Sequence, residues 1–301
     1  LRRLISESAV STKRIAVVGA GVNGVSIATA CASLGHQVQL FDESTPFDQT
    51  SSASSRMLHG GIRYIEQGHI GLVREALIER DGWLRFAPNA TRVERFYFPV
   101  YQESKRGRWL LFAGTLIYQW LAGRFSVGPS QLHSSEDLKH VFPSLIPQGL
   151  CGGASYCDVV MEYEPLIQRL VDEARKQGVR IVENTRIERL YSEGRIDTAD
   201  QTLEFDRVIN AAGPWAAKLL EASDVDSGFT IDHVRGSHLI VQASFRHALV
   251  LQAPGERRII FVIPLDPEHV LLGTTEQKHD ISDPIVCTDA VSYTHLRAHE
   301  T

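Results

Sequence analysis

The sequence contains no apolar run long enough to cross a bilayer, since none reaches the roughly 18 residues that a transmembrane helix needs. Positive charge is not in excess either: 31 lysines and arginines against 36 aspartates and glutamates leave a net charge of −5. Nucleic acid is therefore not an expected partner. The opening residues, Leu1–Ile5, are too few and too soon followed by polar residues to form a signal peptide. These absences predict a cytoplasmic protein.

Cysteine is scarce, and its spacing does not suggest a metal site. The chain has four cysteines, Cys31, Cys151, Cys157 and Cys287, and no C-x-x-C pair. Five residues separate Cys151 from Cys157, which is not a spacing typical of metal ligands. We expect free thiols in a reducing compartment and no metal, with a disulfide as the alternative.

The length and composition are those of a globular protein with two domains. At 301 residues, 43% of them hydrophobic, the chain can bury a substantial core. Near its start, residues 14–19 form a β-branched run that predicts a buried parallel strand. Residues 21–34 are small and apolar and predict a tightly packed helix, which Gly35 ends. Residues 37–41 predict a second strand.

A dinucleotide-binding motif lies between the first strand and the helix, where that motif belongs. Gly19 permits a tight turn, Gly21 lets backbone amides approach a pyrophosphate, and Gly24 lets the helix pack close to the sheet. The candidate cofactor residues of this loop are Gly19, Ala20, Gly21, Asn23 and Gly24. Asp42, at the end of the second strand, is placed to bind an adenosine ribose, which argues against NADP but does not separate FAD from NAD. A glycine-rich turn without a ligand is the alternative.

Residues 50–64 combine hydroxyl groups, paired glycines and reactive side chains within one loop. Ser52, Ser54 and Ser55 can follow a pyrophosphate, while Gly60 and Gly61, preceded by His59, can let a flat ring lie against backbone. Arg63 and Tyr64 would then face whatever reacts with that ring. The alternatives are a solvated flexible loop for the serines and a local hydrogen bond for His59.

A second run of small residues points to the same cofactor. In Asn210–Trp215, Ala212 and Gly213 end a predicted strand and would bring backbone close to a bound dinucleotide. Together with the loop at 50–64, this run favours a flavin over a nicotinamide.

Elsewhere, hydrophobic periodicity, capping residues and the positions of glycine and proline predict the remaining elements. Ser134 and Asp137 resemble a capping box that opens a short helix before Pro143. Further helices are expected at 71–86, 109–121 and 165–177. Strands are expected at 95–101, 179–183, 207–211, 237–242, 259–265 and 269–274.

On these residues the chain resembles the FAD-dependent glycerol-3-phosphate dehydrogenases of the D-amino-acid-oxidase-like superfamily. The resemblance spans about residues 13–285. It is carried by SSASSRMLHGGIRYIEQG at 51–68 and by 72–77, 87–88, 235–238, 258–264 and 273–275. It implies an α/β fold with a Rossmann-like FAD-binding domain, residues 13–90 and 158–225, and an interleaved, mostly antiparallel substrate domain, residues 91–157 and 226–290. Residues 1–12 would be an N-terminal extension.

The resemblance also implies an activity and roles for site residues. The expected reaction oxidises sn-glycerol 3-phosphate to dihydroxyacetone phosphate by hydride transfer to flavin N5, with electrons passing to quinone or oxygen. His238 is the candidate base, because a neutral imidazole can accept a proton near pH 7. Arg63 suits a phosphate or a developing alkoxide, and Tyr64 can donate a hydrogen bond there. Structural hydrogen bonding for His238, a surface ion pair for Arg63 and simple packing for Tyr64 are the alternatives.

Two departures from the family leave other functions open. The chain has Tyr163–Leu166 where the family usually has Asp-Ala-Arg-Leu, and it lacks the family's later arginine-bearing substrate segment and Gly-Gly-Lys flavin segment. Another hydroxy acid or an amine is therefore an alternative substrate, and a non-catalytic flavin-binding protein is a further alternative. Residues 291–301 resemble a translated sequencing-adapter string, so we expect them to be non-native and the family sequence to be truncated.

The basic flanks of 109–121 suit shallow contact with anionic lipid, and the resemblance implies a peripheral enzyme on the cytoplasmic face of the inner membrane. A core helix of the substrate domain is the alternative. Homo-oligomer formation is left open.

Overall fold

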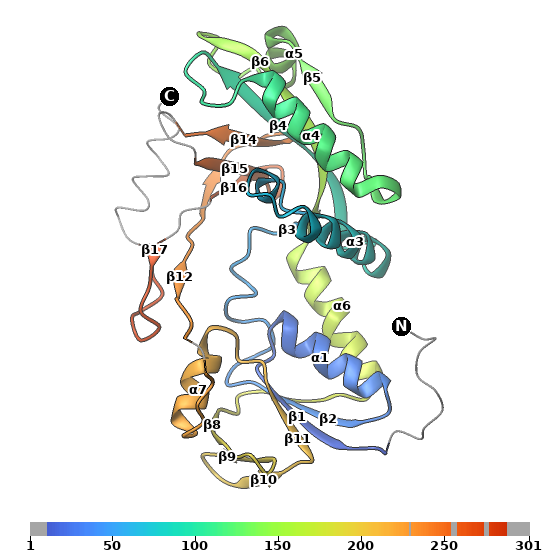
Figure 1. Cartoon of the computed structure of the whole chain (residues 1–301), viewed down its shortest axis with the longest axis vertical. Helices are drawn as coiled ribbons and strands as arrows, with labels where there is room; N and C mark the ends of the chain where they lie inside the picture. The colour runs from blue at the N-terminus through green and yellow to red at the C-terminus, as the bar shows by residue number, and fades with distance from the viewer. Residues whose placement is uncertain (1–10, 229, 254–257, 274–276, 288–301) are drawn as a thin grey trace. The chain divides into compact units, whose positions relative to one another are not determined.

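The computed structural model describes residues 11–228, 230–253, 258–273 and 277–287, and the chain divides into two compact units (Figure 1). The first unit contains the chain up to Ser54 together with Glu164–His233, and the second contains Ser55–Tyr163 and the chain from Val234 onward. The expected tail at 291–301 lies outside the described residues.

The first unit is built on a four-stranded parallel sheet. Its strands are β1 (Arg14–Val18), β2 (Gln37–Phe41), β7 (Arg180–Val182) and β11 (Arg207–Asn210), in the spatial order β11-β1-β2-β7. The chain moves outward from β1 through β2 to β7 and then returns to pair β11 with the other side of β1. This order reverses direction between β1 and β11, as in the doubly wound dinucleotide-binding sheets.

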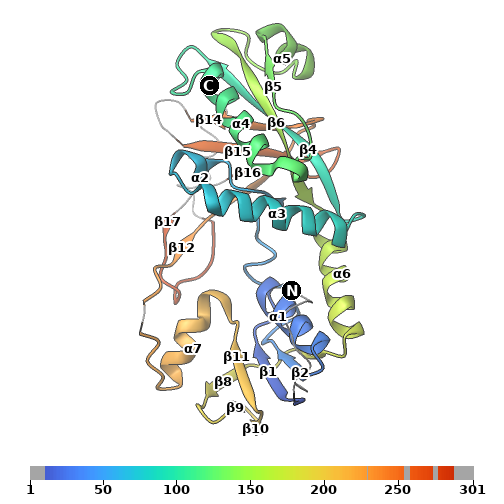
Figure 2. The same cartoon turned by 45° about the vertical axis from the view of Figure 1, so that its right-hand side comes forward.

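Helices and a small second sheet cover the parallel sheet. Helix α1 (Val22–Ser33) buries Gly24, Val25, Ala28 and Ala32, so its small side chains bring its axis close to the strands. Helix α6 (Tyr163–Lys176) connects to β7, and both views show it beside α1 (Figures 1 and 2). The antiparallel sheet of β8 (Ile187–Leu190), β9 (Arg195–Thr198) and β10 (Thr202–Glu204) shares a buried core with β1 and β2. Helix α7 (Ala216–Ala222) follows a short 3₁₀ turn at Gly213–Trp215.

The second unit is organised around an eight-stranded sheet. The order along it is β13-β16-β15-β14-β4-β6-β3, with β5 also pairing with β6, and among these pairs only β14 with β4 is parallel within the described residues. The bounds are β3 (Met57–Leu58), β4 (Thr91–Tyr101), β5 (Gln131–His133), β6 (Leu150–Met161), β13 (Leu239–Gln242), β14 (Ala248–Gln252), β15 (Ile259–Pro264) and β16 (His269–Gly273). Strands β12 (Val234–Arg235) and β17 (Gln277–Lys278) form a separate pair.

The two faces of this sheet bury different side chains because strand residues alternate. Phe96 and Phe98 of β4 join one core with α3 (Ile70–Phe86) and α4 (Arg108–Ala122), which lie side by side in both views (Figures 1 and 2). Tyr97 joins the other core, which α5 (Ser135–Val141) covers. The short helix α2 (Arg63–Glu66) precedes α3.

The expected fold class, a Rossmann-like FAD-binding α/β domain interleaved with a mostly antiparallel one, is confirmed. The two compact units do not follow the expected domain bounds at 158–163, which lie in the second unit, at 226–233, which lie in the first, or at residues 55–90, which were expected in the cofactor domain. The structure groups residues 55–90 with the large sheet, since β3 adds to the edge of β6 and α3 buries Val73 and Leu77 in that core.

Helix α4 has both a buried and an exposed apolar face. Thr115, Tyr118 and Ala122 are buried, while five large apolar side chains on α4 are exposed: Trp109, Leu110, Leu116, Ile117 and Trp120. The part of the chain that the structure describes contains no helix with both the length and the apolar character needed to span a bilayer.

Candidate cofactor site

The candidate site of the first unit lies at the carboxyl ends of the parallel strands, where the strand order reverses. Gly19 follows β1, Asp42 follows β2, and Ala211 follows β11. In doubly wound sheets this crevice is the usual place for a ligand, because diverging loops leave room beside the first helix's amino terminus. The topology therefore brings residues far apart in sequence to one edge.

The glycine loop has no room for larger side chains. Gly19 has φ +99°, and a Cβ there would lie 2.5 Å from the Ala211 carbonyl oxygen. A Cβ on Gly24 would lie 1.7 Å from the Gly19 carbonyl oxygen, so α1 approaches the loop only because this residue is glycine. A Cβ on Gly21 would meet the Ser51 hydroxyl at 3.1 Å. The loop leaves the backbone at the start of α1 closely approachable.

The carboxylate of Asp42 holds the glycine loop in place. It accepts hydrogen bonds from the Ala20 amide at 2.6 Å and from the Ser44 amide at 2.9 Å. Ser51, which the sequence analysis did not single out among the serines, accepts a hydrogen bond from the Val22 amide at 3.1 Å and so partners the first turn of α1. Ser52 instead bonds within its own turn, donating to the Gln49 carbonyl at 2.7 Å.

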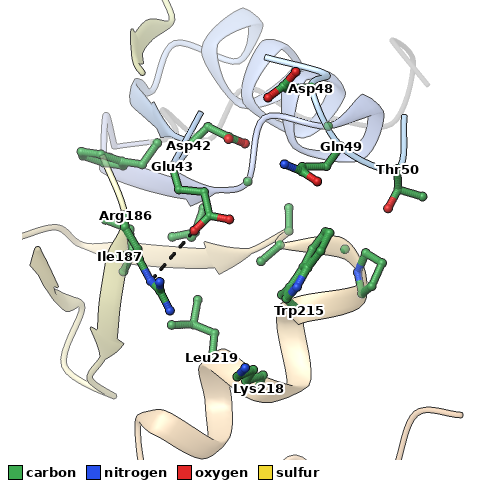
Figure 3. A pocket seen from close by; sticks show the side chains of 18 of the residues that line it. Asp42, Glu43, Asp48, Gln49, Thr50, Arg186, Ile187, Trp215, Lys218 and Leu219 are labelled. Atoms are coloured by element: carbon green, nitrogen blue, oxygen red, sulfur yellow. Dashed lines mark ion pairs between the residues drawn. The ribbon is translucent and has the colours of Figure 1, made fainter. Parts of the chain in front are cut away.

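These elements enclose a cavity of about 620 Å³ (Figure 3). Its lining includes Gly19, Gly21, Asp42, Ala212 and Gly213 of the expected set. The remaining expected residues of this unit, Ala20, Asn23, Gly24, Ser52 and Ser54, are not part of the lining.

Several lining residues were missed by sequence reasoning, among them Glu43, Arg186, Trp215 and Lys218. Glu43 and Arg186 form an exposed ion pair, with 3.9 Å between Glu43 Oε2 and Arg186 Nε, drawn as the dashed line in Figure 3. Trp215 and Lys218 come from the 3₁₀ turn and α7, on the side of the cavity opposite Asp42, Gln49 and Thr50 (Figure 3). The Asn210–Trp215 run was a usable signal for Trp215, but no local pattern indicates that Arg186 faces Glu43.

The second unit contains the turn at His59–Gly61. The Gly60 amide donates to the Tyr118 hydroxyl at 2.7 Å, and the Gly61 amide donates to His59 Nδ1 at 2.9 Å. Gly61 has φ +68°, and a Cβ there would lie 2.5 Å from the ring of Tyr64. Tyr64 also meets His69 edge to face, with 6.4 Å between ring centroids. Arg63 and Tyr64, both exposed, begin α2 directly after this turn.

His238 lies in another part of the second unit. It immediately precedes β13, and its half-buried ring packs so closely on Gly273 that a Cβ there would lie 2.1 Å from it. β13 and β3 stand at opposite ends of the strand order, so the grouping of His238 with Arg63 and Tyr64 stays a prediction. Ser55 also belongs to this unit, just before β3.

The parallel sheet, its glycine loop and the cavity at the strand-order reversal define an α/β dinucleotide-binding protein. Comparison with known proteins narrows the class: the profile of the FAD dependent oxidoreductase family matches residues 14–300, and the chain belongs to that family. This membership confirms the expected oxidoreductase class and its cofactor, FAD.

Individual relatives confirm the resemblance inferred from the sequence. The chain is 35% identical over 276 residues to a glycerol-3-phosphate dehydrogenase of Pseudomonas tolaasii, covering 88% of this chain and 52% of the relative. It is 30% identical over 272 residues to a D-erythritol 1-phosphate dehydrogenase of Brucella abortus, covering 86% and 53%. The chain thus spans about half the length of these curated relatives.

A solved structure shares the fold. The glycerol-3-phosphate dehydrogenase from Bacillus halodurans complexed with FAD superposes with a TM-score of 0.73 at 22% identity, covering 96% of this chain and 53% of that one. The similarity concerns architecture, since the sequences have diverged widely.

Proposed function

We propose that the protein oxidises sn-glycerol 3-phosphate to dihydroxyacetone phosphate with FAD as cofactor. The observation that carries the proposal is the cavity at the strand-order reversal, formed by a loop in which Gly19 and Gly24 leave no space for a Cβ. The relative from Pseudomonas tolaasii, named for this substrate, supports the choice.

The residues of the first unit fit the adenosine and pyrophosphate end of the cofactor. The amides at the start of α1 offer donors and the positive end of the helix dipole to a pyrophosphate. Asp42 and Glu43 both line the cavity and can accept hydrogen bonds from ribose hydroxyls. Trp215 supplies an aromatic wall. These groups favour a dinucleotide without a 2′-phosphate.

Residues of the second unit are assigned to the flavin and substrate. When bound, FAD supplies a two-electron acceptor that takes the hydride from the carbinol carbon at N5. We assign His59, Gly60 and Gly61 to the flavin. His238 is assigned to accept the hydroxyl proton, and Arg63 to bind the phosphate or the developing alkoxide. Tyr64 is assigned a hydrogen bond at the same place. Ser55, together with Ser54 of the first unit, is assigned contacts with the pyrophosphate.

An anaerobic assay tests the proposal. Protein from the complete reading frame, loaded with FAD, should lose its yellow absorbance when sn-glycerol 3-phosphate is added. His238→Asn should retain FAD and slow this bleaching by roughly 10²–10⁴-fold, the usual contribution of a general base. Unchanged bleaching in His238→Asn would remove His238 from the mechanism, and no bleaching in the unaltered protein would reject the substrate.

A second candidate substrate is another polyol phosphate, favoured by the relative named D-erythritol 1-phosphate dehydrogenase. The segment Tyr163–Leu166, which departs from the family pattern, begins helix α6. A panel of polyol phosphates, hydroxy acids and amines in the same bleaching assay would rank them. If every substrate fails while FAD binds, the non-catalytic flavin-binding alternative is favoured.

For partners, we propose a quinone or another electron acceptor and contact with a membrane surface through α4. Trp109, Leu110 and Trp120 are 64%, 62% and 77% exposed, and Lys105 and Arg124 are exposed at the two ends of the helix. Tryptophan beside cationic residues is typical of helices that lie in the interface of anionic bilayers. The proposed site of action is the cytoplasmic face of the inner membrane.

A further inference from the structure

The turn at His59–Gly61 rests on a chain of buried polar groups. Gly60 is buried, and a Cβ on it would lie 2.6 Å from Leu77 and 2.7 Å from the Tyr118 hydroxyl. The turn therefore packs directly on α3 and α4. The Gly60 amide donates its one hydrogen to the Tyr118 hydroxyl.

The direction of each hydrogen bond follows from the chemistry of the groups. A backbone amide can only donate and an ionised carboxylate can only accept, so Tyr118 accepts from Gly60 and donates to Asp158. The distance from the Tyr118 oxygen to Asp158 Oδ2 is 2.6 Å. Because the hydroxyl has a single proton, rotation away from Asp158 would break the bond to the carboxylate.

Asp158 is in turn held from two sides. Its Oδ1 accepts from Arg80 Nη1 at 3.0 Å and from the Val159 amide at 3.1 Å. Arg80 also donates from Nη2 to the Phe125 carbonyl at 2.7 Å. The side chains of Arg80 and Asp158 are each 1% exposed. A buried ion pair of this kind often gives no more stability than well-packed apolar residues would, so stability alone is a weak reason to have one here.

The same surroundings define the state of His59. Its Nδ1 accepts the Gly61 amide proton, which leaves Nε2 as the nitrogen that carries hydrogen in the neutral ring. Although part of the residue is exposed, desolvation lowers the pKa of His59, and the charges of Asp158 and Arg80 oppose each other there. In its neutral form the ring therefore presents an Nε2–H donor beside the turn.

We propose that Tyr118, Asp158 and Arg80 are positioning residues that fix the His59–Gly61 turn, and through it the face assigned to the flavin. The inference rests on the proposed function for its consequence in catalysis. The positioning of the turn does not depend on that function, because it rests on the hydrogen bond that the Gly60 amide donates to Tyr118.

Tyr118→Phe is the sharpest variant, because it removes one oxygen and leaves the Gly60 amide without its acceptor. Tyr156→Phe is the matched control: Tyr156 is equally buried, and its ring meets Tyr118 edge to face at 5.5 Å. Asp158→Asn is the second variant, since it keeps the shape of the side chain and removes the charge that orients Tyr118.

Hydrogen exchange of the segment 57–64, measured without FAD, tests the positioning directly. Tyr118→Phe should exchange roughly tenfold or more faster there, as expected when a buried amide loses its partner, and Tyr156→Phe should match the unaltered protein. Equal exchange in all three proteins would overturn the proposal. Should Tyr118→Phe fail to fold, the same comparison with Asp158→Asn decides.

Flavin reduction tests the catalytic consequence. With FAD retained, Tyr118→Phe should slow the bleaching rate at saturating substrate at least about tenfold and change KM less than twofold, because misplacement affects the transition state more than binding. A wild-type rate would overturn the catalytic part. If exchange changes as expected while no substrate bleaches the unaltered protein, the proposed function fails and the positioning network stands.

Discussion

At the scale of single residues, a missing Cβ controls the candidate cofactor loop. Gly24 lies within α1, where a Cβ would stand 1.7 Å from the Gly19 carbonyl oxygen, much closer than any two such atoms can approach. Gly82 lies within α3 and has no atom within 4 Å of the position its Cβ would occupy. Two helical glycines thus differ only in what surrounds them.

This contrast predicts opposite effects of alanine. Gly24→Ala should lower the free energy of unfolding by about 1–3 kcal/mol, because overpacking forces α1 away from the loop, and FAD affinity should fall roughly tenfold or more. Gly82→Ala should raise the free energy of unfolding by about 0.5–1 kcal/mol, since it only removes glycine's entropy in the unfolded chain. Urea unfolding and FAD titration measure both. Equal effects of the two substitutions would contradict the steric account.

At the scale of elements, the start of α5 shows how a local motif stabilises a helix. The Ser134 hydroxyl accepts the Asp137 amide at 3.1 Å, and Asp137 accepts the Ser134 amide at 2.8 Å, as the capping-box motif predicts. Hydrogen bonds from Ser134, first from its hydroxyl and then from its amide, lower the pKa of Asp137 below the ordinary value of 3.8. The cap is therefore coupled to pH.

Ser134→Ala should lower the free energy of unfolding by about 1 kcal/mol at neutral pH, since the Asp137 amide loses its cap. A lowered carboxyl pKa adds stability above the unfolded value of 3.8 and loses it as pH falls through the folded value. As pH falls below 3.8, Ser134→Ala should therefore lose less stability than the wild-type protein. Urea unfolding across this range measures it, with Ser135→Ala as a control expected to keep the wild-type profile.

The exposed face of α4 gives a second prediction at this scale. If it contacts lipid, the protein should sediment with vesicles containing anionic lipid and remain in solution with neutral ones. Trp120→Ser should weaken this association severalfold, because the indole is among the most exposed apolar groups of the helix. Gly114→Ser, on the same helix with open space around its Cβ position, is the control. Equal sedimentation of Trp120→Ser and wild type would exclude this face.

At the scale of the whole molecule, the chain builds each unit from separate segments. It passes from one unit to the other after Ser54, Tyr163 and His233. The cavity with the glycine loop belongs wholly to the first unit, and the His59–Gly61 turn belongs wholly to the second. We therefore expect the adenosine and pyrophosphate of FAD to affect the first unit, and the flavin to affect the second.

ADP, which carries only the adenosine and pyrophosphate, should slow hydrogen exchange at 19–24, 42–51 and 211–218 in the first unit. FAD should slow exchange there and also at 57–64. Present at about 100 times its dissociation constant, either ligand should add about 2.7 kcal/mol to the stability of the form it binds. Protection of 57–64 by ADP alone would contradict the assignment of that turn to the flavin.

Much of the fold was determined by local pattern. The β-branched run at 14–18, the small residues at 22–33 and the apolar runs of β15 and β16 predict two kinds of element, strand and helix, and the structure has them within a few residues. The glycine loop and Asp42 were found in the same way, because each answers a local steric or polar requirement. The three-stranded sheet at 187–204 was not anticipated, since its strands are short.

What only the tertiary structure decided is which surfaces meet. No local pattern places residues 55–90 with the large sheet, pairs Arg186 with Glu43, or sets Lys218 into the cavity, because each depends on packing summed over distant segments. The link from Gly60 through Tyr118 to Asp158 joins residues up to 98 positions apart, for the Gly60 amide can find its acceptor only after α4 has packed on β6. The sequence by itself determined many of the elements and the cofactor class, and the folded chain decided what holds the site in place.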